Sequence, residues 1–589
     1  MNREPRNLQP PGDTASARTA GFRVGAILAG LLPFVVLEIA LRVFNVGAPA
    51  NQSDPLAGFN RQQPLFEKAG GTFHTVRTRE TFFNPQQFAA IKSTNGFRVF
   101  CFGGSTVFGH PYLSDTAFPK WLQLELAARS PTRSIEVVNC GGISYASYRL
   151  APIVREVLQY QPDLIVIATG ENEFLEDRTY QQIKSRSAFR RSVEEKFFAL
   201  HTATLIRQWL SRDQDSTLAA APPASPALSA EVNARLDDAR SGYASYHRDA
   251  AWHRQVVDQF GDSMRAMIAD CRGENVPLLL VTLGSNLRDC PPYKSEHKGD
   301  LKPDEESRWQ SGFDAATAAE AKDPQAALAL YQSAEAIDNQ HALLAFRQAR
   351  LLDRLGQPAR AREYYLRAKD QDVCPLRMLD QVYELQHRLT AETSTPLVDV
   401  RKLLESLAPD QLPGNDLYLD HVHPTIGGNQ RIAQAVAAKA LDLRLLPNAT
   451  EWTAAARRAT YHRHFQQLDA AYFTNGRRRV EWLENWAQRQ KLAGETIPKE
   501  ASEFLRHGFR SFELGAEEEA WKFFFTALEK DPQNAKSIIN RARQLHDEGR
   551  SEAAQQLVNR LGRVVISREV KSAIDQTSAL FRQDLTPAR

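Results

Sequence analysis

The chain has 589 residues, a length that predicts about three or four domains. Hydrophobic residues make up 42% of it and charged residues 24%, which are the proportions of a globular protein with a sizeable core. The formal net charge of +3 is close to balance and no base-reading motif is present, so we expect no nucleic acid as partner.

The N-terminal segment differs from the rest of the chain. Residues 24–41 form an apolar run interrupted only by Glu38, long enough to cross a bilayer as a helix. Arginines precede the run and are sparse after it. The positive-inside rule therefore predicts a cytoplasmic tail (1–23), a single-pass anchor in the cytoplasmic membrane (24–44), and a catalytic domain on the periplasmic side. A cleaved signal peptide and a buried helix of a soluble protein are the alternatives.

An α/β pattern follows residues 45–95, which we expect to be an irregular polar connection. Short runs rich in Val, Ile, Leu and Phe predict buried strands, and helix-length segments separate most of them. The predicted strands are Phe97–Phe102, Ile135–Val138, Leu164–Ala168, Leu278–Thr282 and Pro396–Val400. The predicted helices cover 117–129, 148–160, 248–273 and 427–442. This alternation indicates a parallel sheet covered on both faces.

Three other stretches depart from that rhythm. Residues 175–247 begin as a basic helical excursion and become Ala/Pro/Ser-rich, which is typical of a flexible linker. In 304–375, small and aromatic residues recur with a period of 34, and the same spacing returns within 446–589. The ladder is clearest at Ala349, Gly356, Ala361, Tyr365 and Ala368. It resembles the tetratricopeptide repeat, whose stacked helices bind protein partners; generic Ala-rich hairpins are the alternative.

Candidate catalytic residues follow the predicted strands. The first strand ends in two glycines and Ser105, a sharp turn that would expose a hydroxyl at the edge of the sheet where ligands bind. The second and third strands end near Gly141 and Asn172, whose N–H groups suit a developing oxyanion.

Asp420 and His423 lie three residues apart in LYLDHVHPT, close enough for the carboxylate to orient the imidazole. His421 is the rival base, but its spacing from Asp420 points it elsewhere. A surface pair or half of a metal site is the alternative interpretation of such an Asp-x-x-His motif.

Together these motifs resemble the SGNH, or GDSL-like, hydrolase family over 96–303 and 376–445. The resemblance implies a flavodoxin-like three-layer α/β/α fold, no cofactor and no metal. It implies a triad of Ser105, Asp420 and His423, and an oxyanion hole formed by Ser105, Gly141 and Asn172. Two departures stand out: the first motif is GGS instead of GDS, and Ser144 replaces a glycine often found three residues after Gly141.

The expected activity is hydrolysis of an acetyl or acyl ester of a cell-envelope glycan or lipid. Asn286 and Arg288, which follow the fourth strand, are candidate substrate-binding residues, although a plain polar loop explains them equally well. An O-acyltransferase of envelope polysaccharide would use the same triad. An interaction scaffold with an inactive hydrolase core is the other alternative.

Overall fold

The computed structural model describes residues 30, 32–44, 64–184, 200–202, 246–489, 498–564 and 567–585. None of the helices in these segments is both long enough and apolar enough to cross a membrane. The predicted anchor over 24–44 is therefore contradicted, and so is the periplasmic placement derived from it. The described helical residues 32–43 carry Glu38 and Arg42, whose side chains pair at 2.8 Å.

The centre of the fold is a five-stranded parallel sheet in the order β5-β4-β6-β7-β8. Its strands are β4 (Gly96–Gly103), β5 (Ser134–Gly141), β6 (Leu164–Ala168), β7 (Leu278–Val281) and β8 (Leu397–Val398). All five overlap the predicted strands. Counted in chain order the arrangement is 2-1-3-4-5, the flavodoxin-like order, whose topological switch point lies between β4 and β6.

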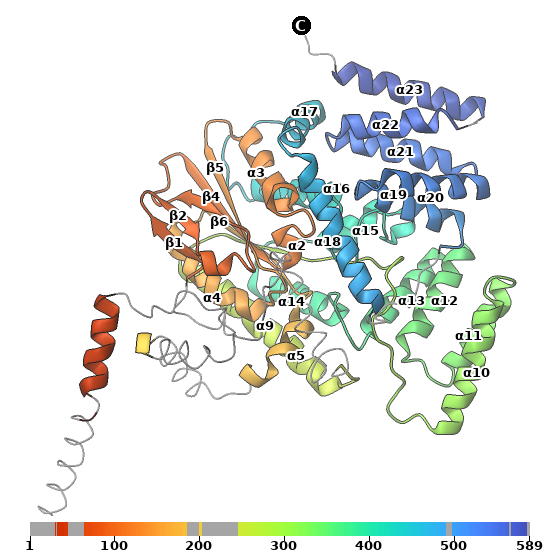
Figure 1. Ribbon diagram of the computed structural model, residues 1–589, viewed down its shortest axis with the longest axis horizontal. Helices are drawn as coiled ribbons and strands as arrows, with labels where there is room; N and C mark the ends of the chain where they lie inside the picture. Colours follow the sequence, from red (N-terminus) through yellow and green to blue (C-terminus); the bar gives the residue numbers. More distant parts are fainter. Residues whose placement is uncertain are drawn as a thin grey trace, which may run out of the picture. The chain divides into compact units, whose positions relative to one another are not determined.

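Helices cover both faces of this sheet (Figure 1). One layer contains α3 (Phe118–Arg129) and α16 (Ile426–Asp442); the other contains α4 (Ser147–Val157), α9 (Ala250–Gly273) and α14 (Asp380–Thr393). The strands are apolar because both of their faces are buried: every residue of β4 and β6 is buried. The α/β prediction is confirmed at this level.

The connection before β4 is more regular than expected. It contains a three-stranded antiparallel sheet of β1 (Phe66–Ala69), β2 (Thr72–Thr75) and β3 (Gln87–Ala89). Phe66, Phe73 and Phe88 meet in ring contacts at centroid distances of 5.0 and 5.3 Å. The strands are only three or four residues long, and much of their stabilising contact comes from aromatic packing against the main domain. Neither feature has a strong periodic signal in the sequence.

Helical hairpins form a third part of the fold. The inserted pair contains α10 (Pro303–Ala319), α11 (Pro324–Glu335), α12 (Ala342–Arg354) and α13 (Pro358–Asp370). The C-terminal pair contains α19 (Ala501–Glu513), α20 (Glu517–Lys530), α21 (Asn534–Asp547) and α22 (Ser551–Leu561), followed by α23 (Arg568–Leu585). Gly356, Gly515 and Gly549 follow α12, α19 and α21 with φ of 70°, 73° and 83°, the left-handed conformation that ends a helix.

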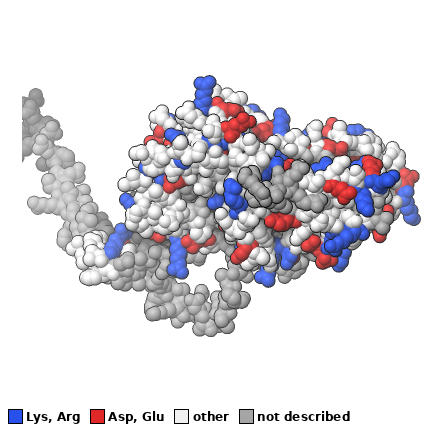
Figure 2. Space-filling view, turned by 90° about the horizontal axis from the view of Figure 1, so that it is seen from above, with Lys and Arg blue, Asp and Glu red and all other residues white. Residues whose placement is uncertain are grey.

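The two groups of hairpins, far apart in sequence, lie side by side (Figure 1). Arg350 of α12 pairs with Glu503 of α19 at 2.6 Å, and Arg354 pairs with Glu500 at 2.8 Å. On the face shown in Figure 2, basic and acidic side chains are interspersed over the surface, as the small net charge leads one to expect.

Candidate active site

The candidate nucleophile lies in the sharp turn between β4 and the short helix α2 (Ser105–Phe108). Gly104 is the N-cap of α2, so Ser105 is its first residue and the Ser105 N–H has no acceptor within the helix. The turn packs tightly against the end of β5, because a Cβ on Gly141 would lie 2.1 Å from the backbone nitrogen of Phe108. Ser105 is only 9% exposed.

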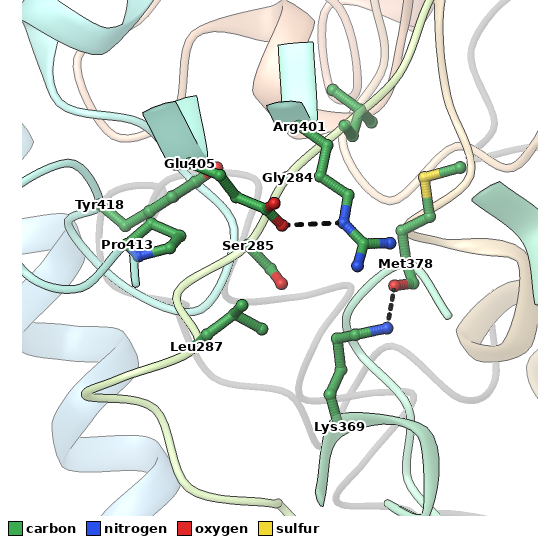
Figure 3. Close-up of a pocket in the computed structure, with 10 residues that line it drawn as sticks. Gly284, Ser285, Leu287, Lys369, Met378, Arg401, Glu405, Pro413 and Tyr418 are labelled. Atoms are coloured by element: carbon green, nitrogen blue, oxygen red, sulfur yellow. Dashed lines mark hydrogen bonds and ion pairs between the residues drawn. The ribbon is translucent and has the colours of Figure 1, made fainter. Parts of the chain in front are cut away.

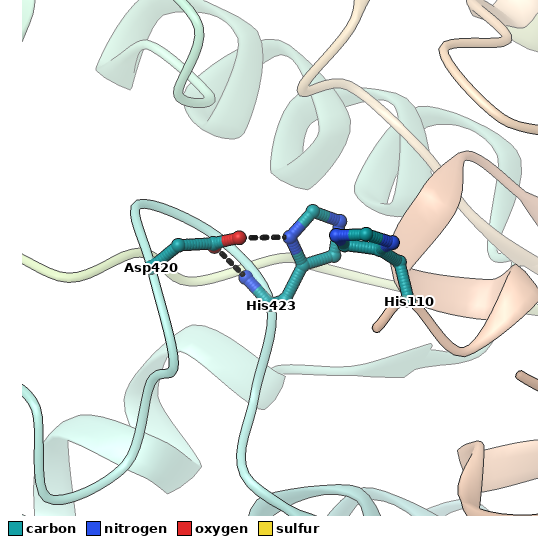
Figure 4. Close-up of side chains that lie close together, drawn as sticks. All are labelled: His110, Asp420 and His423. Atoms are coloured by element: carbon teal, nitrogen blue, oxygen red, sulfur yellow. Dashed lines mark hydrogen bonds and ion pairs between the residues drawn. The ribbon is translucent and has the colours of Figure 1, made fainter. Parts of the chain in front are cut away.

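The structure brings Ser105, His423 and Asp420 together. The Ser105 Oγ lies 2.7 Å from His423 Nε2, and His423 Nδ1 lies 2.6 Å from Asp420 Oδ2 (Figure 4 shows the Asp420–His423 pair). Because a carboxylate can only accept, Nδ1 carries the proton and Nε2 is free to take one from the serine. The other Asp420 oxygen accepts hydrogen bonds from the backbone N–H groups of Val422 and His423, both at 2.9 Å.

The two histidines beside Asp420 differ in their contacts. Burial alone would raise the pKa of the Asp420 carboxyl, but the neighbouring His423 and His421 and the His423 hydrogen bond hold it well below its usual range. His421 Nδ1 stands 3.6 Å from Asp420 Oδ1, beyond hydrogen-bonding range, and burial lowers the pKa of His421 to about 4. His423, and not His421, contacts the serine.

The predicted oxyanion donors differ in availability. The side-chain amide of Asn172 lies against the nucleophile turn, since a Cβ on Gly104 would be 2.2 Å from Asn172 Nδ2. It also donates to the backbone oxygen of Tyr145 at 3.3 Å, which leaves its second hydrogen. The Gly141 N–H, in contrast, already donates to Asn139 Oδ1 at 2.9 Å. Gly141 therefore fits the role of a packing position better than that of a donor.

Ser144 offers a backbone donor that the sequence did not identify. Its φ is 58°, the left-handed conformation that favours glycine, which explains why a glycine is common at this position in the family it resembles. Within the described residues its N–H has no hydrogen-bond acceptor, and the next residue, Tyr145, holds Asn172. The sequence signal for this position is the serine at 144, where the family that the chain resembles often has a glycine.

His110 is a further neighbour that the sequence did not identify. Its ring lies edge-to-face against His423 with centroids 4.5 Å apart, and burial followed by the proximity of His423 keeps the pKa of His110 well below its usual value (Figure 4). His110, Asp420 and His423 present possible metal-ligand atoms within 4.8 Å of one another. Both nitrogens of His423 already serve Ser105 and Asp420, so a metal bound there would break the hydrogen-bonded relay.

Glu171 is a buried acid next to the nucleophile turn. Its Oε1 would lie 2.5 Å from a Cβ on Gly104, so the Glu171 side chain would have to shift to admit a GDS-type aspartate at position 104. Neither carboxyl oxygen forms a hydrogen bond of normal geometry with a described residue. Burial raises the pKa of Glu171 to about 8, although the N–H groups of Glu171 and Gly170 oppose the shift. Glu171 is therefore largely a neutral carboxylic acid at neutral pH.

The two candidate substrate-binding residues, Asn286 and Arg288, have polar partners within the fold. Arg288 is 6% exposed and its guanidinium binds Asp353 of α12 at 2.6 and 2.7 Å and Asp410 at 3.0 Å. Asn286 is 1% exposed, and its side-chain amide donates to Asn415 at 2.9 Å. Its backbone N–H donates to the carbonyl of His421 at 3.0 Å, so it supports residues 419–423, which carry Asp420 and His423 and are called the catalytic loop below. Sequence patterns do not reveal such partners, which come from distant segments.

A small pocket under residues 283–287 is likewise filled by its own charges (Figure 3). Its volume of about 10 Å³ leaves room for about one water molecule. Arg401 pairs with Glu405 at 3.0 Å, and Lys369 donates to the carbonyl of Met378 and to Asp380, both at 2.9 Å. The pocket cannot take an ester substrate.

Comparison with known proteins shows only distant structural likenesses. No family model and no curated protein matches the sequence. An alpha/beta hydrolase enzyme from the metagenome of Lake Arreo, Spain, is 14% identical, with a TM-score of 0.25, covering 59% of this chain and 96% of its own. A putative acylhydrolase from Bacteroides fragilis is 12% identical, with a TM-score of 0.26, covering 67% and 98%. Because both TM-scores lie far below 0.5, the evidence on function is the geometry of the site.

Proposed function

We propose that this protein is a serine hydrolase that cleaves ester bonds with Ser105 as nucleophile, His423 as base and Asp420 as its partner. One observation carries the proposal: the unbroken relay from Ser105 Oγ to His423 Nε2 at 2.7 Å and from His423 Nδ1 to Asp420 at 2.6 Å. It lies at the carboxyl end of β4, next to the switch point of the sheet, where open α/β sheets bind ligands.

In the first half of the reaction, Ser105 Oγ attacks the ester carbonyl carbon while His423 Nε2 takes the hydroxyl proton. Asp420 holds the Nδ1–H and stabilises the imidazolium. The imidazolium then gives its proton to the departing alcohol oxygen, which leaves an acyl group on Ser105. Water attacks that acyl group by the same proton route, and the carboxylic acid is released.

The developing oxyanion needs donors already in place. We assign this role to the N–H of Ser105, the side-chain amide of Asn172 and the N–H of Ser144 in place of Gly141. The support for Ser144 is its left-handed backbone, its unengaged N–H and its position next to Tyr145, whose carbonyl anchors Asn172. The support against Gly141 is its bond to Asn139.

The test is covalent labelling of the purified full-length chain with a fluorophosphonate. We expect one label, on the peptide that contains Ser105, and none in Ser105→Ala or His423→Ala. A folded wild-type chain that stays unlabelled and does not hydrolyse p-nitrophenyl acetate would overturn the proposal. If labelling occurs but the acyl-enzyme is discharged faster by a sugar hydroxyl than by water, the triad serves acyl transfer instead of hydrolysis.

A further inference from the structure

The catalytic loop is held from outside at two of its carbonyl groups. The loop closes on itself through the Leu419 N–H, which donates to the carbonyl of His423 at 2.9 Å. The carbonyl of Leu419 accepts a hydrogen bond of 2.6 Å from Arg510 Nε, and that of His421 accepts one of 3.0 Å from Asn286. The peptide bond that precedes Asp420 is therefore attached to Arg510, a residue of the C-terminal helix α19.

Helix α19 is itself anchored next to this loop. One turn before Arg510, Arg506 binds Asp289 through Nε at 2.8 Å and Nη2 at 2.9 Å, and both side chains are at most 10% exposed. Asp289 also accepts the backbone N–H of Asn415 at 2.8 Å, so this ion pair joins α19 to the segment after β7 and to the residues just before the catalytic loop. Because this ion pair is buried, it holds α19 in place: separating the two charges would leave each of them unpaired in the interior.

The loop that follows α2, after the nucleophile, is also hydrogen-bonded to the C-terminal part of the chain. The Tyr112 hydroxyl donates to the carbonyl of Glu513, the last residue of α19, at 3.0 Å. Arg479 of α18 (Ala470–Arg489) donates to the carbonyl of Pro111 at 2.7 Å. Pro111 follows His110, whose ring packs on His423. Helices outside the α/β domain thus contact the catalytic loop and the loop that follows α2.

We propose that Arg510 is a positioning residue for the triad, which holds the peptide before Asp420 so that the carboxylate keeps its orientation toward His423. The inference rests on the proposed function. An Asp420 Oδ2–His423 Nδ1 distance of 2.6 Å leaves little room for displacement, and misplacement by about 1 Å can cost about 10²-fold in rate. The helical hairpins are then a structural part of the active site.

The experiment compares Arg510→Met, Arg510→Lys and Arg560→Met in the full-length chain. Met keeps the aliphatic length of Arg510 without its hydrogen bond, and Lys restores one donor. Arg560 of α22 pairs with Glu518 on an exposed surface, so Arg560→Met is the matched control. We expect Arg510→Met to lower kcat about 10- to 100-fold with little change in KM. We expect Arg510→Lys to recover part of the loss and Arg560→Met to match the wild type.

The pH profile separates positioning from a general loss of stability. If Asp420 is misoriented, the imidazolium of His423 loses its support, and the acid limb of the kcat profile should move to lower pH in Arg510→Met. If Arg510→Met had the same kcat as Arg560→Met, the proposal would be overturned. It would also be overturned if thermal unfolding of Arg510→Met explained its whole loss of kcat and the pH profile did not shift. If Arg510→Met does not fold, the comparison of Arg510→Lys with wild type decides by the same two readouts. A wild-type chain without activity would instead refute the proposed function.

Discussion

A side chain at position 104 and the amide of Asn172 compete for the same space: a Cβ on Gly104 would lie 2.2 Å from Asn172 Nδ2. The GGS motif is therefore matched to this site. The same Cβ would lie 2.5 Å from Oε1 of the Glu171 carboxyl, so Glu171 would also have to shift to admit a side chain at 104. Where the GDS motif that this sequence resembles has an aspartate, this chain has Gly104, and an acid, Glu171, follows the neighbouring strand β6.

We predict that Gly104→Asp, although it restores the commoner motif, lowers kcat by about 10² or more because Asn172 is displaced from the oxyanion. Gly104→Ala should have the same direction of effect. Gly273→Ala, at a position where a Cβ meets nothing within 4 Å, is the control and should keep full activity. Ester turnover of the purified variants is the measurement; a fully active Gly104→Asp variant would show that a side chain at 104 does not displace Asn172, and would refute the prediction.

For the triad, Ser105→Ala and His423→Ala should each reduce turnover by about 10⁴ to 10⁶, and the double variant should be hardly worse than either alone. Asp420→Asn should lose nearly as much, because the imidazole loses its oriented tautomer. Asn172→Ala should cost less, about 10² to 10³. His421→Ala is the control. If His421→Ala abolished turnover while His423→Ala did not, the base would be assigned to the wrong histidine.

Ser144 has a left-handed φ of 58°, a conformation that glycine adopts without strain. We predict that Ser144→Gly keeps activity, since the proposed donor is the backbone N–H, and changes the free energy of unfolding by no more than about 1 kcal/mol. Ser144→Val should lose both stability and activity because a β-branched side chain is strained at this φ. Chemical denaturation and ester turnover measure the two effects, and equal behaviour of Gly and Val would contradict this role of the loop.

Glu171 should make stability depend on pH. Its pKa is about 8 in the folded protein against an ordinary value of 4.5, so the folded state favours the protonated form. The stability that this preference provides is fully present below about pH 4.5 and is lost as the pH rises toward 8. Glu171→Gln removes the titration, and its advantage over wild type in free energy of unfolding should grow between about pH 5 and pH 8. The exposed Glu274→Gln should show no such trend, and a constant difference for Glu171→Gln would refute the prediction.

The strands and the triad spacing could be predicted from the sequence because both are local. Continuous apolar runs indicate buried parallel strands, and polar residues after parallel strands meet at one edge of a sheet. The three-residue spacing of Asp420 and His423 places the carboxylate within reach of the imidazole without distant residues. The small sheet β1–β3 was not predicted, because its strands are short and depend on aromatic contacts with the main domain. The membrane anchor was predicted from an apolar run and is contradicted by the described helices.

Only the tertiary structure decided which polar groups are engaged. Arg288 and Arg506 look equally available in the sequence, yet their partners Asp353 and Asp289 lie 65 and 217 residues away. The choice of Ser144 over Gly141 as proposed donor depends on tertiary contacts: the Gly141 N–H donates to Asn139, and no described residue accepts the Ser144 N–H. The link between Arg510 and Leu419 spans 91 residues. Sequence periodicity reports which face of an element is buried, whereas hydrogen-bond partners are set by how distant elements pack, because a buried polar group must find a partner wherever the fold brings one.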